Sequence, residues 1–379
     1  MAIDPFFHRR ELAREFTGRI LSSAVLAPAR SGLFLAAPRR TGKSTFLRED
    51  LIPELGAAGA AVLYIDLWAD KTVDPGQAIV AMVRSALGAE DGLVLKAFRK
   101  AGLHKVALAE LSFDVAKVGL GTGVSLSSAL AALSDQLQRV IVLIIDEAQQ
   151  AVTTASGTDA LFALKAARDE LNSSEHHGLR IVATGSSQAK LALLRASKDQ
   201  AFYKAMMQTF PPLDRTYIEW FTRNTGLAVT LDVDKTFELF AKAGHRPEVP
   251  IEALGNLMDG RKLTDDNVDA EFAKTVDQAI EDSDEAILKV VAALTPLQAA
   301  VLRVMIQQAD KYAPYAAATL NAYREEIKRA SAEANVDVPN VQTALEALQT
   351  KALVWRAAHG QYALEEQGLA DLLAARGLL

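Results

Sequence analysis

The segment from Ala37 to Thr45 has the composition of a phosphate-binding loop. Its residues are, in order, Ala37, Pro38, Arg39, Arg40, Thr41, Gly42, Lys43, Ser44 and Thr45. In such loops a glycine lets the backbone approach phosphate oxygens, the lysine reaches the outer phosphates, and the next hydroxyl ligates Mg²⁺. The usual pattern begins with glycine, whereas Ala37 disfavours a positive φ. We predict that these nine residues bind ATP, with Lys43 also catalytic and Ser44 a metal ligand.

The elements on either side of this loop fit the same interpretation. An apolar run at 33–35 precedes it, and residues 46–51 have helical spacing of their apolar side chains. In a strand–loop–helix unit, backbone N–H groups and the helix dipole create positive potential where the phosphates bind. The alternative is a chance match on a surface turn, and the flanking strand and helix make that alternative weak.

A second candidate group is the pair Asp146 and Glu147, which follows six consecutive aliphatic residues at 140–145. Such a run is typical of a central strand in a parallel sheet. Both carboxylates then lie at its carboxyl end, beside the phosphate loop. We predict that Asp146 holds Mg²⁺ through water and that Glu147 polarises the water that attacks the γ-phosphate.

A third group follows the apolar segment 179–183, where Thr184 and Ser186 flank a glycine. We expect this strand to lie next to the strand that ends at Asp146. A hydroxyl at its tip could then bond the γ-phosphate or the attacking water. Ser186 or Ser187 could equally cap the following helix. The two roles are not exclusive, and the sequence leaves them open.

Composition limits the class of protein. The 379 residues are half apolar, enough for two or three domains with proper cores. The absence of cysteine excludes disulfides, iron–sulfur clusters and thiolate zinc sites, and the six histidines form no recognisable metal site. No signal peptide or membrane span is recognisable, so we expect a soluble cytoplasmic protein. The net charge of −6 argues against a broadly basic nucleic-acid binder.

The patterns divide the chain into three domains. Residues 1–214 are expected to form the α/β core, with a β-hairpin inserted at about 103–124 that is either a plain pair of strands or a partner contact. Residues 215–285 carry helical signals only, and nine acids face a single lysine between 265 and 285. Residues 286–379 predict three helices followed by a hairpin, which is the pattern of a winged helix.

The predicted winged helix is electrically neutral. Residues 286–379 carry nine basic and nine acidic residues, and the presumed recognition helix at 339–349 has no basic residue. Because nonspecific DNA affinity depends on phosphate neutralisation, strong autonomous DNA binding is not expected. A protein partner, double-stranded DNA through a local basic patch, and an oligomer contact all stay open.

With these parts together, the chain resembles an AAA+ P-loop ATPase of the archaeal-ATPase/STAND-like group, relatives of origin-recognition initiators. The resemblance rests on segments 38–44, 144–149, 183–187 and 244–247, followed by the winged helix. It implies a three-layer αβα core with a parallel sheet, a small all-α lid, and a nucleotide pocket between core and lid. Thr184 or Ser186 would be a first sensor and Arg246 a second sensor. Arg246 could equally be a surface arginine after a helix.

Proteins of this group often complete the site with an arginine from a neighbouring subunit. Arg195 and Arg215 are the candidates here, so a homo-oligomer is one expectation.

The sequence thus predicts an Mg²⁺-dependent ATPase that couples nucleotide state to conformational change and to engagement of a partner or DNA. The alternative is a nucleotide-gated switch with very slow hydrolysis. A small-molecule kinase fits less well, because the Asp-Glu pair suits water activation.

Overall fold

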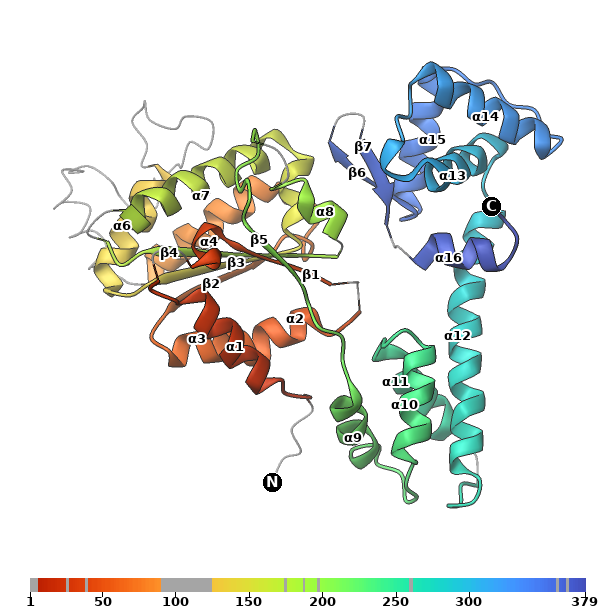
Figure 1. The fold of residues 1–379 in the computed structure, drawn as a ribbon, viewed down its shortest axis with the longest axis horizontal. Helices are drawn as coiled ribbons and strands as arrows, with labels where there is room; N and C mark the ends of the chain where they lie inside the picture. The colour runs from red at the N-terminus through yellow and green to blue at the C-terminus, as the bar shows by residue number, and fades with distance from the viewer. Residues whose placement is uncertain are drawn as a thin grey trace. The chain divides into compact units, whose positions relative to one another are not determined.

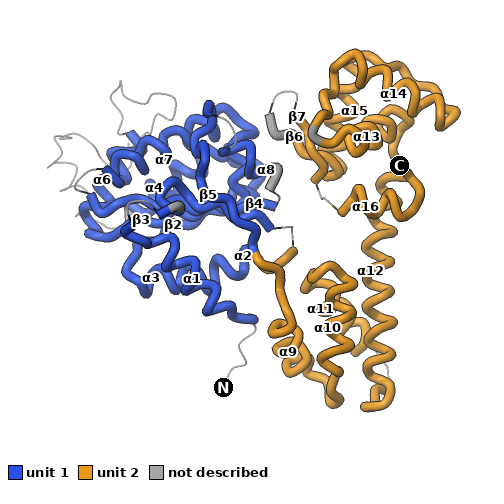
Figure 2. Tube along the Cα trace, viewed as in Figure 1, with its two compact units in different colours: residues 1–37, 43–210 blue, residues 38–42, 211–379 orange. Residues whose placement is uncertain are grey.

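The structure of the chain is a computed structural model (Figure 1). It describes residues 6–24, 27–37, 40–89, 125–173, 176–186, 188–195, 198–258, 262–358, 361–365 and 368–379. The predicted hairpin at about 103–124 lies outside these residues. The chain divides into two compact units, residues 1–37 with 43–210, and residues 38–42 with 211–379 (Figure 2).

The first unit is built on a parallel five-stranded sheet. Its strands are β1 (Leu33–Ala36), β2 (Ala61–Asp66), β3 (Ile141–Asp146), β4 (Leu179–Gly185) and β5 (Met206–Thr209), in the spatial order β2-β3-β4-β1-β5. The predicted neighbourhood of β3 and β4 is confirmed. The edge strand β5 was not predicted, since its four residues carry too short a pattern. Because all strands are parallel, the segments that follow β1, β3 and β4 emerge at one edge.

Helices cover both faces of this sheet because successive side chains of each strand point to opposite faces. Leu33 and Leu35 join the core under α1 (Arg10–Ile20), α2 (Lys43–Phe46) and α3 (Ile52–Ala57). Phe34 joins the opposite core, under α4 (Pro75–Ala89), α6 (Leu126–Leu137) and α7 (Ala155–Ser173). The short helix α8 (Gln188–Ala192) follows β4. The predicted three-layer αβα fold is confirmed (Figure 1).

The second unit is helical for most of its length. It contains α9 (Arg215–Arg223), α10 (Val233–Lys242), α11 (Glu248–Met258) and the 25-residue α12 (Val268–Ala292). Phe221, Ala253 and Phe272 share one buried core. The predicted boundary at 285/286 falls inside α12, whose Ile287 packs against the core of the last segment. One helix therefore belongs to both cores, and the domain limits stay a prediction.

The last segment has three helices, a hairpin and a terminal helix. These are α13 (Pro296–Gln308), α14 (Ala317–Arg329), α15 (Val338–Thr350), the antiparallel pair β6 (Val354–Ala358) and β7 (Gln361–Leu364), and α16 (Gly368–Ala375). Thr295 caps α13 in a reciprocal capping box with Gln298, and Pro296 occupies the first turn of the helix. The small hairpin after the helices is consistent with the predicted winged helix. Among the described residues, no helix is both long and apolar enough to cross a membrane.

Candidate nucleotide site

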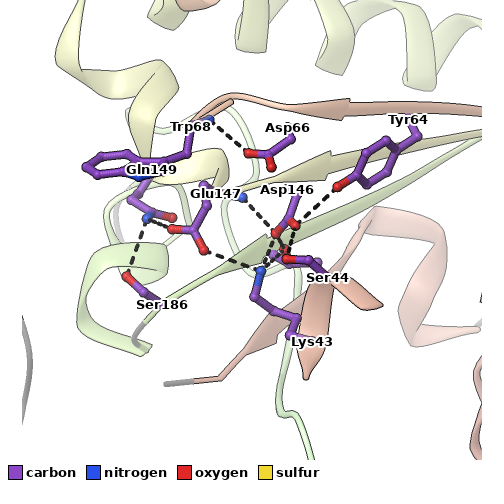
Figure 3. Close-up of polar contacts among 10 residues, drawn as sticks. Lys43, Ser44, Tyr64, Asp66, Trp68, Asp146, Glu147, Gln149 and Ser186 are labelled. Atoms are coloured by element: carbon purple, nitrogen blue, oxygen red, sulfur yellow. Dashed lines mark hydrogen bonds and ion pairs between the residues drawn. The ribbon is translucent and has the colours of Figure 1, made fainter. Parts of the chain in front are cut away.

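The centre of the site is a buried lysine at the start of α2. Lys43 is 5% exposed, and its Nζ donates to Asp146 Oδ1 (Figure 3). It also donates to Thr184 Oγ1 over 3.1 Å. The Thr184 hydroxyl in turn donates to Asp146 Oδ1. A charged ammonium is stable at such depth only with charged and hydrogen-bonding partners. The structure thus brings the ends of β3 and β4 together around the lysine of the predicted phosphate loop.

Asp146 is fully buried and accepts hydrogen bonds from several elements. Its Oδ2 accepts from Ser44 Oγ at 2.6 Å and from Tyr64 Oη at 3.3 Å, and its Oδ1 accepts from the Glu147 amide at 3.0 Å. Burial acts to raise the pKa of Asp146, but the Lys43 charge and the hydrogen bonds from Lys43, Ser44 and Thr184 outweigh it, so the pKa lies below its ordinary value. The carboxylate is therefore ionised at neutral pH.

The donor set suits a magnesium ion. Mg²⁺ prefers oxygen ligands, commonly one or two protein side chains together with substrate phosphates. Ser44 Oγ and Asp146 Oδ2 lie 2.6 Å apart on the side of the carboxylate that also contacts Tyr64. Burial raises the pKa of Tyr64, and the Asp146 charge raises it further, so its hydroxyl stays a donor. Ser44 and Asp146 are the residues that would hold the ion.

Glu147 is held in a strained backbone conformation. Its φ of 53° and ψ of 42° are left-handed, a region that non-glycine residues rarely adopt and that clusters at functional sites. Its Oε1 lies 3.3 Å from Lys43 Nζ, and its Oε2 accepts a 2.6 Å hydrogen bond from Gln149 Nε2. Glu147 therefore lies beside the lysine, with both carboxylate oxygens engaged (Figure 3).

The two hydroxyls predicted as sensors have different surroundings. Thr184 is fully buried and contacts Lys43 and Asp146. Ser186 lies one residue beyond β4, 7% exposed, and its Oγ is 3.5 Å from Gln149 Nε2. Thr184 is thus part of the lysine cluster, whereas Ser186 reaches Glu147 through Gln149. Which of them senses the nucleotide stays a prediction.

The rest of the phosphate loop is described from Arg40 onward and at Ala37, while Pro38 and Arg39 lie outside the described residues. Ala37 is 1% exposed, and its amide donates to the Gly185 carbonyl at 3.0 Å, which extends the β1–β4 ladder. Positive φ values occur at Arg40 (61°) and Gly42 (79°). Thr41 is buried, and Thr45 is exposed on α2. The positive φ values of the described loop residues thus lie after Ala37. A left-handed backbone in this loop therefore does not require glycine at position 37.

Arg246 belongs to the second unit. Its Nε donates to the Ala243 carbonyl at 2.9 Å at the end of α10. Its side chain lines a groove of about 520 Å³ that Arg40 and Lys351 also line. Its role as second sensor stays a prediction.

Arg195 and Arg215 were the candidates for the arginine that a neighbouring subunit would contribute. Arg195 donates to the Ala205 carbonyl at 2.6 Å, and Arg215 pairs with Asp234 at 2.5 Å. Their role stays a prediction.

Two residues of the site were not among the predicted ones. Gln149 was recognised as part of the segment after Glu147 but received no role. Tyr64 lies on β2 and was not a candidate site residue. Tyr64 reaches Asp146 because β2 pairs with β3 in register, and this register is not visible in the sequence. No sequence signal shows that the Gln149 side chain turns back toward Glu147, since this depends on the left-handed residue between the strand and the helical turn at Ala148–Thr153.

Comparisons with known proteins give structural matches only. No family model and no curated protein matches the chain. The ORC2 protein of Aeropyrum pernix in its ADP form matches with a TM-score of 0.54 and 14% identity, over 99% of this chain and 95% of that one. Two further structures match with lower TM-scores. The Aeropyrum pernix ORC1 protein in complex with DNA has a TM-score of 0.44 and 16% identity, over 99% of this chain and 94% of that one. Cdc6p of Pyrobaculum aerophilum has a TM-score of 0.42 and 15% identity, over 99% of this chain and 95% of that one.

At these identities the likeness concerns the fold. It extends over nearly the whole length of both chains, from the parallel sheet to the C-terminal helices and hairpin. The predicted resemblance to origin-recognition relatives is confirmed at that level. This chain has the fold of the Aeropyrum pernix ORC2 protein, with a parallel α/β core followed by helices and a small hairpin.

Proposed function

We propose that this protein binds ATP with Mg²⁺ and hydrolyses it to ADP and phosphate. The observation that carries the proposal is the cluster of Lys43, Ser44, Asp146 and Glu147 at one edge of a parallel sheet. A lysine, a metal-binding hydroxyl, a buried carboxylate and a second carboxylate are the groups that water attack on a γ-phosphate requires. The fold match to a protein described in its ADP form supports the same ligand class.

Each residue has a distinct part in this reaction. Lys43 and the backbone N–H groups of the loop would stabilise negative charge on the transferred phosphoryl group. Ser44 and Asp146 would hold Mg²⁺, which neutralises charge on the phosphates when bound. Glu147 would orient the attacking water and accept its proton. The Thr184 hydroxyl holds Lys43 and Asp146 at the required positions.

The test is the change Glu147→Gln. It keeps the size of the side chain but removes its ability to accept a proton, so ATP should still bind while turnover falls about 100-fold or more. Glu54→Gln is the control, because it makes the same chemical change on α3, a helix that carries no residue of the cluster. Turnover by Glu147→Gln at the wild-type rate would show the catalytic assignment to be incorrect.

Hydrolysis would serve to couple nucleotide state to a partner. Helix α12 belongs to the cores of both the lid helices and the C-terminal segment, so a shift of the lid would be transmitted along it. The neutral charge of residues 286–379 favours a protein partner or a second copy of the chain over strong DNA binding. We place this activity in the cytoplasm, where ATP is available.

A nucleotide-gated switch with slow hydrolysis is the second candidate. The contact between Lys43 Nζ and Glu147 Oε1 favours it, because the lysine competes with an attacking water for that carboxylate oxygen. The two functions are separated by ATPase rates measured with and without double-stranded DNA, together with the mass of the particle with ATP bound. Turnover that rises with DNA supports the ATPase, whereas a slow constant rate with an ATP-dependent mass supports the switch.

A further inference from the structure

A glutamine beside the proposed catalytic glutamate has no assigned role. Gln149 is 0% exposed, and its Nε2 lies 2.6 Å from Glu147 Oε2 and 3.5 Å from Ser186 Oγ (Figure 3). Because a carboxylate only accepts hydrogen bonds, the nitrogen of the amide must face Glu147, which fixes the orientation of the side chain. Gln149 therefore links the residue that follows β3 to the residue that follows β4.

The residues around Gln149 Oε1 are compatible with this orientation of the amide. Gln149 Oε1 is buried without a hydrogen-bond partner in the described structure. Burying a carbonyl oxygen without a partner is unfavourable, so packing alone does not account for a glutamine here. Gly185 lies against this oxygen, since a Cβ at position 185 would come within 2.4 Å of it. The glycine between Thr184 and Ser186 thus makes room for the amide.

We propose that Gln149 is a positioning residue that sets the orientation of the Glu147 carboxylate and makes it depend on Ser186 at the tip of β4. This inference rests on the proposed ATPase function. Lys43 contacts Oε1 and Gln149 binds Oε2, so removing the amide leaves the carboxylate held on one side only. A carboxylate free to rotate would orient water poorly, because a small misplacement is costly in rate.

The main variant is Gln149→Met, which nearly conserves volume and removes the amide. We expect kcat to fall about tenfold or more while the Kd for ATP and the melting temperature stay close to wild type. Gln150→Met is the matched control, because the neighbouring Gln150 Nε2 is buried and has no hydrogen-bond partner among the residues that the structure describes. Wild-type kcat in Gln149→Met, or a loss of ATP affinity parallel to the loss of kcat, would overturn the proposal.

Gly185→Ala provides an independent test that leaves Gln149 in place. Its methyl group must displace the Gln149 amide oxygen, and the Leu191 side chain must also shift, so kcat should fall in the same direction without a matching loss of ATP affinity. The same change in the Gln149→Met background should reduce kcat less than it does in wild type. An equal reduction in both backgrounds would show that Gly185 acts independently of Gln149.

The dependence on Ser186 is tested by a double-mutant cycle. Ser186→Ala should lower kcat in the wild type and have little further effect in Gln149→Met, because the link is already broken. Additive losses would overturn the link. If wild type hydrolyses ATP, Glu147→Gln does not, and Gln149→Met matches wild type, this inference fails alone. If Glu147→Gln keeps full activity, the proposed catalytic function fails.

Discussion

Two buried polar networks of this chain differ in what they contain. At the sheet edge of the first unit, Lys43 and Asp146 bring opposite charges together almost without exposure. In the C-terminal segment, the hydroxyl of Tyr312 lies 2.7 Å from that of Tyr323, which donates to the Pro314 carbonyl at 3.3 Å. The first network contains charged groups, and burial of charge is unfavourable. The second network contains only neutral groups.

This difference indicates where function resides. A neutral network of hydroxyls is worth about 1 kcal/mol for each bond and contributes to one defined packing. A buried ion pair is weak evidence for stability, because desolvation offsets much of the attraction. Its presence at the carboxyl ends of parallel strands is better explained by the proposed nucleotide site. The variants below separate the two kinds of network.

The largest effect is expected for Lys43→Met, which leaves the Asp146 charge buried without its cation. Removing one partner of a buried pair costs about 3–5 kcal/mol, so the free energy of unfolding should fall by an amount near that range and ATP binding should be lost. Lys328→Met is the control, because Lys328 pairs with Glu325 at 3.1 Å on the surface and should cost less than about 1 kcal/mol. Urea unfolding and ATP titration measure both effects.

The effect of Lys43→Met should depend on pH. The pKa of Asp146 lies below its unfolded value of about 3.9, so the folded protein gains stability from the ionised group above that pH and loses it as pH falls through the folded pKa. Without Lys43, burial should raise the pKa of Asp146. Protonation of Asp146 at lower pH then removes the cost of burying its charge. The difference between wild type and Lys43→Met should therefore shrink from pH 7 toward pH 4. A constant difference would contradict a charge-based cost.

Much of the charged network could be predicted from the sequence because its chemistry is local to strand ends. Six aliphatics before Asp146 require a buried strand, and a glycine–lysine–serine sequence after another apolar run requires a loop at the same edge. The position of Lys43, Ser44 and Asp146 follows from these two facts and the parallel order of strands. The fold class follows from the same alternation of apolar runs and helical patterns.

The contacts that could not be predicted depend on backbone turns and on strand neighbours. Gln149 reaches Glu147 only because Glu147 itself is left-handed, which no residue preference indicates. Tyr64 reaches Asp146 because β2 pairs with β3 in one register. The strand β5 has four residues and no alternating pattern. Helix α12 continues to Ala292, past the domain limit predicted at 285/286, because its apolar side chains also pack against the core of the last segment.

A second, smaller contrast comes from removing one hydroxyl from each network. Thr184→Val deletes a hydroxyl that donates to the Asp146 carboxylate, and Tyr323→Phe deletes one that bonds only neutral groups among its described contacts. Hydrogen bonds to charged groups contribute about 1.5–3 kcal/mol, against about 0.5–1.5 kcal/mol for neutral ones. Thr184→Val should therefore destabilise more and should also lower turnover. Equal losses of stability with unchanged turnover in both would remove the distinction.

The smallest effect concerns the C-terminal segment and DNA. On α15, Val341 and Leu345 face the core, whereas Gln342 and Glu346 are exposed. Glu346→Lys replaces an acid by a base on this outward face. If α15 meets a phosphate backbone, each added contact should steepen the dependence of log affinity on log salt by about 0.9. Fluorescence anisotropy with a labelled duplex over a salt series measures the slope.

The matched control for this change is Glu325→Lys, which makes the same substitution at an exposed position of α14. We expect weak wild-type binding, a steeper slope for Glu346→Lys and a wild-type slope for Glu325→Lys. Equal slopes for both variants would mean that the steeper salt dependence comes from the change in net charge and not from the position of the new lysine on α15. Tight wild-type binding with a steep slope would mean that phosphate contacts come from other residues, and the neutral charge of residues 286–379 would then no longer argue for a protein partner.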